Sequence, residues 1–544
     1  MPSCHTYEDT LLQVQDDAER VGLPYRWWLI DSWWHAMSGE ECWEGTVEQV
    51  GALFPHGLRW LYNRSKGMSF GAHWSSSFGK TSPYLNVTDP SDWSCNTSCI
   101  PRSARVWEHI FASAESWGLQ TIKVDHLYGS LESNGACFSD PFLAEDFLGG
   151  IADGAKAHNV DVMWCMSYPN VLMQSVKHPA ATHARASADS HPSGNNFVGF
   201  AGESTWIWAI GLWPFKDTFY SNTSELTQNP YAGWEDYCRG EHDPRPTGGT
   251  SCRYNQGRLP ATCPDGRGEQ MPFSHALVSA LGGGGVAPGG VVGGADVPLV
   301  LMTCRADGVL LKPTVPAMYI DRVWLGRESG LGEIATARTV LQGLAWAFTY
   351  RVCAPGVGQY DNAADKSQIP SCNGSSTVAL TASDIGLGPH QSDKRAKYVT
   401  YRWCGSRPSG RCQNAGLRPS VQPLSDAHPF AIGGSGSSST PAEADYWVAA
   451  PVLRNGWAVL GEAEKLVPVS AQRIATLDTT QQGDATAVSL VATGVPMEEV
   501  DMLFADKALQ VHAVSCKLPR SGRVRMTIEQ SGGGAAPKSG CAEL

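Results

Sequence analysis

The feature that most constrains the fold is a repeated alternation of short apolar segments and amphipathic helices in the first half of the chain. The segments "YRWWLID", "MSFGAH", "LQTIKVD", "VDVMWCM" and "THARASAD" have the composition of strands, and most of them end in polar or charged residues. Helical patterns separate them, beginning with residues 7 to 22, where Thr6 and Asp9 form a capping-box pattern. This alternation predicts a parallel α/β sheet.

Closure of that sheet into a (β/α)8 barrel is favoured because residues suited to chemistry stand at the carboxyl ends of successive strands, where the βα loops of a barrel gather. The predicted strands end near seven positions: Asp31, His73, Asp125, Met166, Arg185, Trp213 and Leu281. A barrel of this class has eight strands. The missing first strand should precede Thr6, so we expect a barrel that is incomplete at its N-terminus.

The sequence pattern changes at about residue 331, from alternating strands and helices to short β-like segments. Segments such as "AKYVTYRWCG", "DYWVAAPVL", "GWAVLGE" and "AVSLVATG" are short and β-like, with Gly, Pro, Ser and Asp between them. The junction segment "EIATARTVLQGLAWAFTYRV" fits either a helix or strands. We therefore predict two domains, a catalytic barrel over residues 1–330 and an antiparallel β-sandwich over residues 331–544.

Charge and hydropathy exclude several classes of partner. The chain has 53 acidic and 41 basic residues, a net charge of -12, and no basic block, which argues against nucleic acid as a partner. The longest uncharged stretch, residues 276 to 295, contains eight glycines and a proline, so we expect a loop there and no membrane insertion.

Cysteine usage indicates an oxidising compartment. The 16 cysteines include no CxxC pair, which favours disulfides over zinc or redox motifs. Five N-x-S/T sequons agree with a secreted or secretory-pathway glycoprotein: Asn63, Asn86, Asn96, Asn222 and Asn373. The chain starts without a recognisable signal peptide, so we expect that signal outside it. The histidines lack metal-ligand spacing, and we predict no metal and no organic cofactor.

Two aspartates are candidates for chemistry. Asp125 and Asp189 each follow a predicted strand, and each lies close in sequence to a cation, Lys123 or Arg185. Hydrolysis of a glycosidic bond uses such a pair, one carboxylate as nucleophile and one carboxylic acid as proton donor. The alternative for each residue is a structural role as a helix cap or ion-pair partner.

Aromatic residues surround a third aspartate. The stretch "RWWLIDSWW" places Trp33 and Trp34 just beyond Asp31 in a chain that has 20 tryptophans. Indole rings pack on the apolar faces of sugars, so these two side chains are candidates for a pocket wall.

An ordered series of motifs resembles the retaining α-glycosidase clan of α-galactosidases, α-N-acetylgalactosaminidases and raffinose synthases, the melibiase-like enzymes. The series runs through "LIDSWW", "FPHGLRWLYNRSKGMSFGAH", "WGLQTIKVD", "VMWCMSYP" and "RASAD", over about residues 20 to 190. The resemblance implies a (β/α)8 barrel followed by a β-sandwich. It also implies that Asp125 is the nucleophile, that Asp189 is the acid/base, and that sugar hydroxyls bind to Asp31, Lys123 and Arg185.

Two positions depart from the pattern of the clan. Ser32 follows Asp31 where α-galactosidases show a second acid, and Met166 follows Cys165 where they show Glu. The resemblance therefore indicates the reaction type and leaves the sugar open.

The resulting expectation is a retaining glycoside hydrolase that cleaves terminal α-linked sugars, α-galactosidase-like, from an oligosaccharide or glycoconjugate by double displacement. Two alternatives stay open. One is glycosyl transfer of the raffinose-synthase kind, and the other is a carbohydrate-binding glycoprotein on a catalytically decayed barrel.

Overall fold

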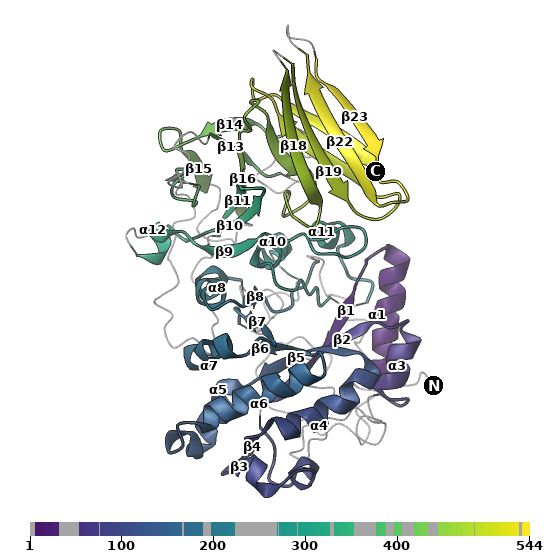
Figure 1. The fold of residues 1–544 in the computed structure, drawn as a ribbon, viewed down its shortest axis with the longest axis vertical. Helices are drawn as coiled ribbons and strands as arrows, with labels where there is room; N and C mark the ends of the chain where they lie inside the picture. Colours follow the sequence, from purple (N-terminus) through teal and green to yellow (C-terminus); the bar gives the residue numbers. More distant parts are fainter. Residues whose placement is uncertain are drawn as a thin grey trace, which may run out of the picture. The chain divides into compact units, whose positions relative to one another are not determined.

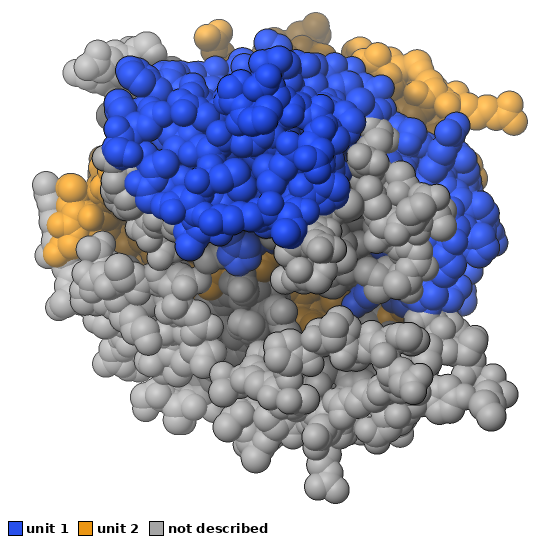
Figure 2. Space-filling view, turned by 90° about the horizontal axis from the view of Figure 1, so that it is seen from below, with its two compact units in different colours: residues 1–185, 207–213, 225–266 blue, residues 186–206, 214–224, 267–544 orange. Residues whose placement is uncertain are grey.

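The structure is a computed structural model that describes residues 6–31, 54–75, 77–165, 168–188, 197–222, 269, 271–290, 292–326, 331–352, 377–387, 397–404, 418–433, 444–482, 485–531 and 536–544. Contacts divide the chain into two compact units that interleave in sequence. The first comprises residues 1–185, 207–213 and 225–266, and the second comprises residues 186–206, 214–224 and 267–544; Figure 2 colours them separately. The predicted domain boundary after residue 330 stays a prediction.

The first unit is built on a parallel sheet. Its strand order is β1-β2-β5-β6-β7-β8, and the pairings from β1 to β7 are parallel; β8 starts in the first unit and ends in the second. The strands are β1 (Trp27–Ile30), β2 (Ser69–Ser75), β5 (Leu119–Asp125), β6 (Asp161–Trp164), β7 (Ala181–Arg185) and β8 (Trp213–Phe215). The predicted parallel α/β sheet is confirmed, whereas its closure into an eight-stranded barrel stays a prediction.

Helices connect these strands in the predicted alternation (Figure 1). They are α1 (Tyr7–Val21), α3 (Leu58–Arg64), α4 (Ala104–Ala114), α5 (Leu127–Ser133), α6 (Leu143–Ala157) and α7 (Pro169–Gln174), with 3-10 turns η2 (Pro83–Asn86), η3 (Pro90–Asp92), η4 (Glu115–Trp117), η5 (Gly135–Phe138) and η6 (Ser175–Lys177). The predicted capping box is present, since Thr6 Oγ1 accepts from the Asp9 amide and Asp9 accepts from the Thr6 amide. This box fixes the start of α1.

One face of the sheet is apolar because it packs against helices. Ile30, Ala72, Ile122 and Val162 are register partners in a row across four strands, and all are fully buried. Two positions after Ala72, on the same face, the Trp74 ring packs edge-on against Trp107 and Phe111 of α4. Alternation along each strand then turns the intervening side chains to the other face.

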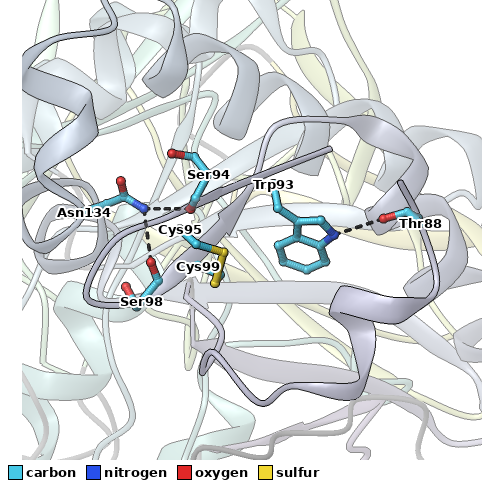
Figure 3. The surroundings of a disulfide bond; sticks show 7 residues. All are labelled: Thr88, Trp93, Ser94, Cys95, Ser98, Cys99 and Asn134. Atoms are coloured by element: carbon cyan, nitrogen blue, oxygen red, sulfur yellow. Dashed lines mark hydrogen bonds between the residues drawn. A yellow bond between two sulfur atoms is a disulfide. The ribbon is translucent and has the colours of Figure 1, made fainter. Parts of the chain in front are cut away.

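A disulfide closes a small hairpin after β2. Strands β3 (Trp93–Cys95) and β4 (Cys99–Pro101) pair antiparallel, and the Cys95–Cys99 bond joins their ends. Asn134 donates from its side-chain amide to the carbonyls of Ser94 and Ser98, at 3.0 and 3.4 Å (Figure 3). This closest cysteine pair of the sequence is thus a disulfide, as the cysteine pattern indicated.

The second unit is largely antiparallel (Figure 1). Its six-stranded sheet has the order β14-β13-β16-β11-β10-β9, and a separate pair is β12-β15. The strands are β9 (Val315–Tyr319), β10 (Glu333–Leu341), β11 (Leu344–Val352), β12 (Thr377–Leu380), β13 (Tyr398–Arg402), β14 (Val421–Leu424), β15 (Phe430–Gly433) and β16 (Asp445–Pro451). The helices are α8 (Phe200–Ala209), which begins in this unit, α10 (Pro272–Gly282), α11 (Val297–Leu301) and α12 (Asp321–Trp324).

The C-terminal part consists of two further antiparallel sheets. One has the order β17-β20-β21 and the other β18-β19-β22-β23. Their bounds are β17 (Ala458–Glu462), β18 (Ile474–Gln482), β19 (Ala485–Thr493), β20 (Glu499–Ala505), β21 (Val511–Lys517), β22 (Arg523–Gln530) and β23 (Lys538–Glu543). A disulfide between Cys516 of β21 and Cys541 of β23 links the two sheets. The segments predicted as short β-like elements are strands here.

The structure corrects one predicted strand and decides the secondary structure of the ambiguous junction segment. The seventh predicted strand, near Leu281, is wrong, because these residues belong to helix α10. Its sequence has no helical polar face, since Pro272 through Gly282 are nearly all buried, and burial on every side hides the periodicity. The ambiguous junction segment is a hairpin of β10 and β11, turning at Gln342 and Gly343, which both have positive φ.

Among the described helices, none is both long and apolar enough to cross a membrane.

Candidate active site

Asp125 is the last residue of β5 and lies at the carboxyl end of the parallel sheet. Its side chain is only 10% exposed. His126 follows with φ 54° and ψ 23°, a left-handed conformation that ends the strand and precedes α5. The backbone N–H of His126 donates to Asp125 Oδ1 at 2.7 Å, so the turn itself fixes one oxygen of the carboxylate.

Strand register brings other polar residues to the same face. In β2 and β5, His73 is the partner of Lys123 and Ser75 is the partner of Asp125. His73 is therefore a diagonal neighbour of Asp125, two positions away along the strand. His73 Nε2 donates to Asp125 Oδ2 at 2.8 Å, and both side chains are buried.

The charge of Asp125 is set by its neighbours. Burial by itself raises the pKa of this carboxyl. The hydrogen bond and electrostatic interaction with His73, together with the charges of Lys123 and Arg185, outweigh burial. The pKa of Asp125 therefore lies well below its ordinary value, and the group is a carboxylate at any physiological pH.

The structure brings four predicted site residues together. Lys123 is buried, and its Nζ lies 3.5 Å from Oδ2 of the half-exposed Asp31, which follows β1. Arg185 ends β7 and acts electrostatically on Asp125. The arrangement joins a buried, ionised carboxylate to cations and to a second carboxylate that solvent can reach.

Three predicted site residues lie outside the described residues: Asp189, Trp33 and Trp34. The predictions for them, as acid/base and pocket wall, are therefore untested.

The sequence analysis missed the role of His73. It took this residue as the end of a predicted strand, whereas β2 continues to Ser75. A buried histidine one strand away from a candidate nucleophile was the available signal, but only the β2–β5 register shows that the two side chains meet.

One group in the described part of the chain could hold a metal ion. His73, Asp125 and His126 each offer one ligand atom, and these atoms all lie within 4.8 Å of one another. His126 is the exposed member of the three.

A cavity of about 170 Å³ lies elsewhere in the first unit, by α1 and the start of β1. Gln15, Leu23, Trp28 and Met68 are among its lining residues, and none of the predicted site residues is.

No protein-family model matches the chain, and no curated protein matches it either. Solved structures do match. The α-galactosidase of Lactobacillus brevis is 14% identical with a TM-score of 0.43, over 82% of this chain and 53% of the other. A GH36 α-galactosidase of Geobacillus stearothermophilus is 10% identical with a TM-score of 0.43, over 82% and 54%. The chain thus spans about half the length of these two proteins. The trehalulose synthase MutB of Pseudomonas mesoacidophila is 9% identical with a TM-score of 0.33, over 80% and 94%.

Proposed function

We propose that the chain is a retaining glycoside hydrolase that cleaves terminal α-linked sugars, α-galactosidase-like, from an oligosaccharide or glycoconjugate. The observation that carries the proposal is the buried Asp125 carboxylate at the end of β5, which His73, Lys123 and Arg185 keep ionised. A nucleophile for an anomeric carbon needs such a group, because a protonated carboxyl cannot attack.

In this mechanism Asp125 attacks the anomeric carbon and the bond to the leaving oxygen breaks. Asp189 donates the proton that the leaving oxygen takes up, and a covalent glycosyl-enzyme forms. Asp189 then removes a proton from water, which attacks the same carbon and releases Asp125. Double displacement requires the two carboxyl groups to lie about 5 to 5.5 Å apart. A crystal structure would measure that separation directly.

The neighbouring charges suit sugar recognition. Asp31 is half-exposed and paired with Lys123. The Asp31 carboxylate can accept a hydrogen bond from one sugar hydroxyl, and the Lys123 ammonium group can donate one to an adjacent hydroxyl. Arg185 completes the polar face, and Trp33 and Trp34 are the proposed pocket wall. We also propose a secretory route, for which the disulfides Cys95–Cys99 and Cys516–Cys541 and the exposed sequon asparagine Asn96 are the support.

The test is hydrolysis of a panel of nitrophenyl α- and β-glycosides by the full chain. We expect release from one α-glycoside, retained in Asp161→Asn and abolished in Asp125→Asn. Asp161 is a matched control because it stands at the opposite end of the neighbouring strand β6.

A 5-fluoro glycosyl fluoride of the sugar so identified should label Asp125, detected as a mass increase on its peptide. Adding a free sugar acceptor separates hydrolysis from transfer by the product formed. A folded chain that binds sugars and releases none from any glycoside would reject the hydrolase and favour a binding protein.

A further inference from the structure

We propose that His73, Asp125 and His126 form an inhibitory binding site for a divalent transition metal ion, with Zn²⁺ as the preferred ion. Two imidazoles and one carboxylate are a donor set that zinc takes in proteins. The three ligand atoms lie within 4.8 Å of one another, although the residues come from two strands and a turn. The ion would bind the carboxylate that the proposed function uses as nucleophile.

Two of the ligands are already in place. His73 Nε2 and Asp125 Oδ2 are 2.8 Å apart. Zn–N and Zn–O bonds of about 2.0 to 2.1 Å in a tetrahedron put ligand atoms about 3.3 Å from one another. A shift of about half an ångström, with the imidazole proton displaced by the metal, therefore converts the hydrogen bond into two metal bonds.

The third ligand, His126, is exposed, whereas His73 and Asp125 are buried. His126 is exposed, so its ring can turn about its side-chain bonds, and a metal ion can reach it from solvent. Its ring already lies edge-on to that of His73, with centroids 6.3 Å apart. The His126 amide holds Asp125 Oδ1 at 2.7 Å, which orients the carboxylate in the way that outer hydrogen bonds orient metal ligands.

Local charge sets a limit on affinity. Lys123 and Arg185 act on Asp125 electrostatically, and they repel a divalent cation. We therefore expect reversible binding that a chelator undoes, as suits an inhibitory site, and little binding of Mg²⁺ or Ca²⁺, which prefer all-oxygen sites.

The predicted inhibition rests on the proposed function, because it requires Asp125 to be the nucleophile. The predicted binding of the metal ion does not depend on the proposed function. A bound ion would occupy Asp125 Oδ2 and withdraw its electron pair, so that the carboxylate could not attack the anomeric carbon. The imidazole of His126 has no part in the proposed chemistry, and a substitution of the side chain keeps the backbone amide that holds Asp125 Oδ1, so metal binding can be removed separately through this side chain.

The experiment titrates ZnCl₂ into the full chain by calorimetry, for the wild type, for His126→Asn and for the control His158→Ala. Asn is chosen because it tolerates the left-handed backbone of residue 126. His158 is distant in sequence, and its partly buried ring contacts Glu115 rather than any of the three proposed ligands. We expect one ion per wild-type chain, binding at least about 100-fold weaker in His126→Asn, and no change in His158→Ala.

Two readouts do not need the variant to fold. Co²⁺ bound to the wild type should show visible absorption bands, and Zn²⁺ should protect His126 from diethyl pyrocarbonate, measured on its peptide. Equal Zn²⁺ binding by the wild type and a folded His126→Asn, or unprotected His126 at saturating Zn²⁺, would overturn the site.

Activity completes the test. Zn²⁺ should suppress glycoside hydrolysis by the wild type, EDTA should restore it, and His126→Asn should resist. Stoichiometric binding through His126 with full activity would overturn the inhibition. Binding through His126 by a chain that hydrolyses no glycoside would instead uphold the metal site and reject the proposed function.

Discussion

Asp125 illustrates how a few neighbours decide the chemistry of one residue. The carboxylate is buried, which by itself favours the neutral acid, yet its interaction with His73 and the charges of Lys123 and Arg185 reverse that preference. Glu333 in the second unit shows the opposite outcome. It is also buried, and it accepts hydrogen bonds from the Gly199 amide and from the hydroxyls of Tyr319 and Tyr350, at 2.6, 3.2 and 3.3 Å. No full positive charge is among these partners, and burial raises the pKa of Glu333 to about 7.

Replacing His73 with Ala should raise the pKa of Asp125, because the strongest opposing contribution is removed. A hydrogen bond to a charged group is worth about 1.5 to 3 kcal/mol, so kcat/KM should fall roughly 10- to 100-fold. The acid limb of its pH profile should also move to higher pH, measured with the nitrophenyl glycoside that the chain hydrolyses. A lower rate with an unmoved acid limb would make His73 only a structural residue, and His158→Ala serves as the control.

Replacing Glu333 with Gln should change how stability depends on pH. The folded pKa, about 7, lies above the ordinary value of 4.5, so the folded state binds more protons between these values. The free energy of unfolding therefore falls as pH rises through this window, by on the order of 3 kcal/mol from this group. Gln can accept from Gly199 and donate to a tyrosine hydroxyl without ionising. Urea unfolding at pH 4.5 and 7.5 should show a smaller fall in the variant, and equal falls would contradict the assignment.

At the level of elements, close helix packing depends on a single missing side chain. Helices α4 and α6 pack against each other, and a Cβ at Gly154 of α6 would stand 2.5 Å from the Cβ of Trp107 and 3.0 Å from the amide nitrogen of Glu108. Backbone and a buried indole cannot move aside cheaply. Gly129 of α5 faces open space, since a Cβ there meets nothing within 4 Å.

The two glycines form a matched pair for mutation to Ala. Gly154→Ala should lower the free energy of unfolding by about 1 to 3 kcal/mol through overpacking. Gly129→Ala should raise it by about 0.5 to 1 kcal/mol, because Ala loses less backbone entropy in a helix. Urea unfolding midpoints of the two variants measure this difference. Midpoints that both rise relative to the wild type would show that α4 and α6 pack less closely than in the structure.

At the scale of the whole molecule, the Cys95–Cys99 and Cys516–Cys541 disulfides close loops of very different length. The Cys516–Cys541 bond spans 25 residues and ties two sheets, whereas Cys95–Cys99 spans 4 residues within one hairpin. A longer closed loop restricts the unfolded chain more.

Replacing Cys516 and Cys541 together with Ser should therefore cost about 3.5 kcal/mol, and replacing Cys95 and Cys99 about 2 kcal/mol. Thermal unfolding of the oxidised proteins measures both. A larger loss for the Cys95–Cys99 pair than for the Cys516–Cys541 pair would show that strain or residual structure, rather than loop closure, controls their contributions.

Local sequence patterns were enough to predict the helices and strands of this protein where periodicity is clear. The α4 segment is an example, since Val106, Ile110, Phe111 and Ala114 recur at helical spacing in the sequence and all four are buried. The same reasoning failed at α10, where burial on every side removes the periodic signal. The junction hairpin was ambiguous for a related reason, because long apolar segments fit both helix and strand.

The sequence by itself determined the parallel α/β character of the first unit, the β-rich C-terminal part and the position of Asp125 at a strand end, because those properties depend on local spacing and composition. Only the tertiary structure decided which side chains meet there. His73 and Asp125 are 52 residues apart, and their contact depends on the register of β2 against β5. A shift of that register by one residue would turn His73 to the opposite face of the sheet. Register is set by packing over the whole sheet, and no local pattern in the chain encodes it.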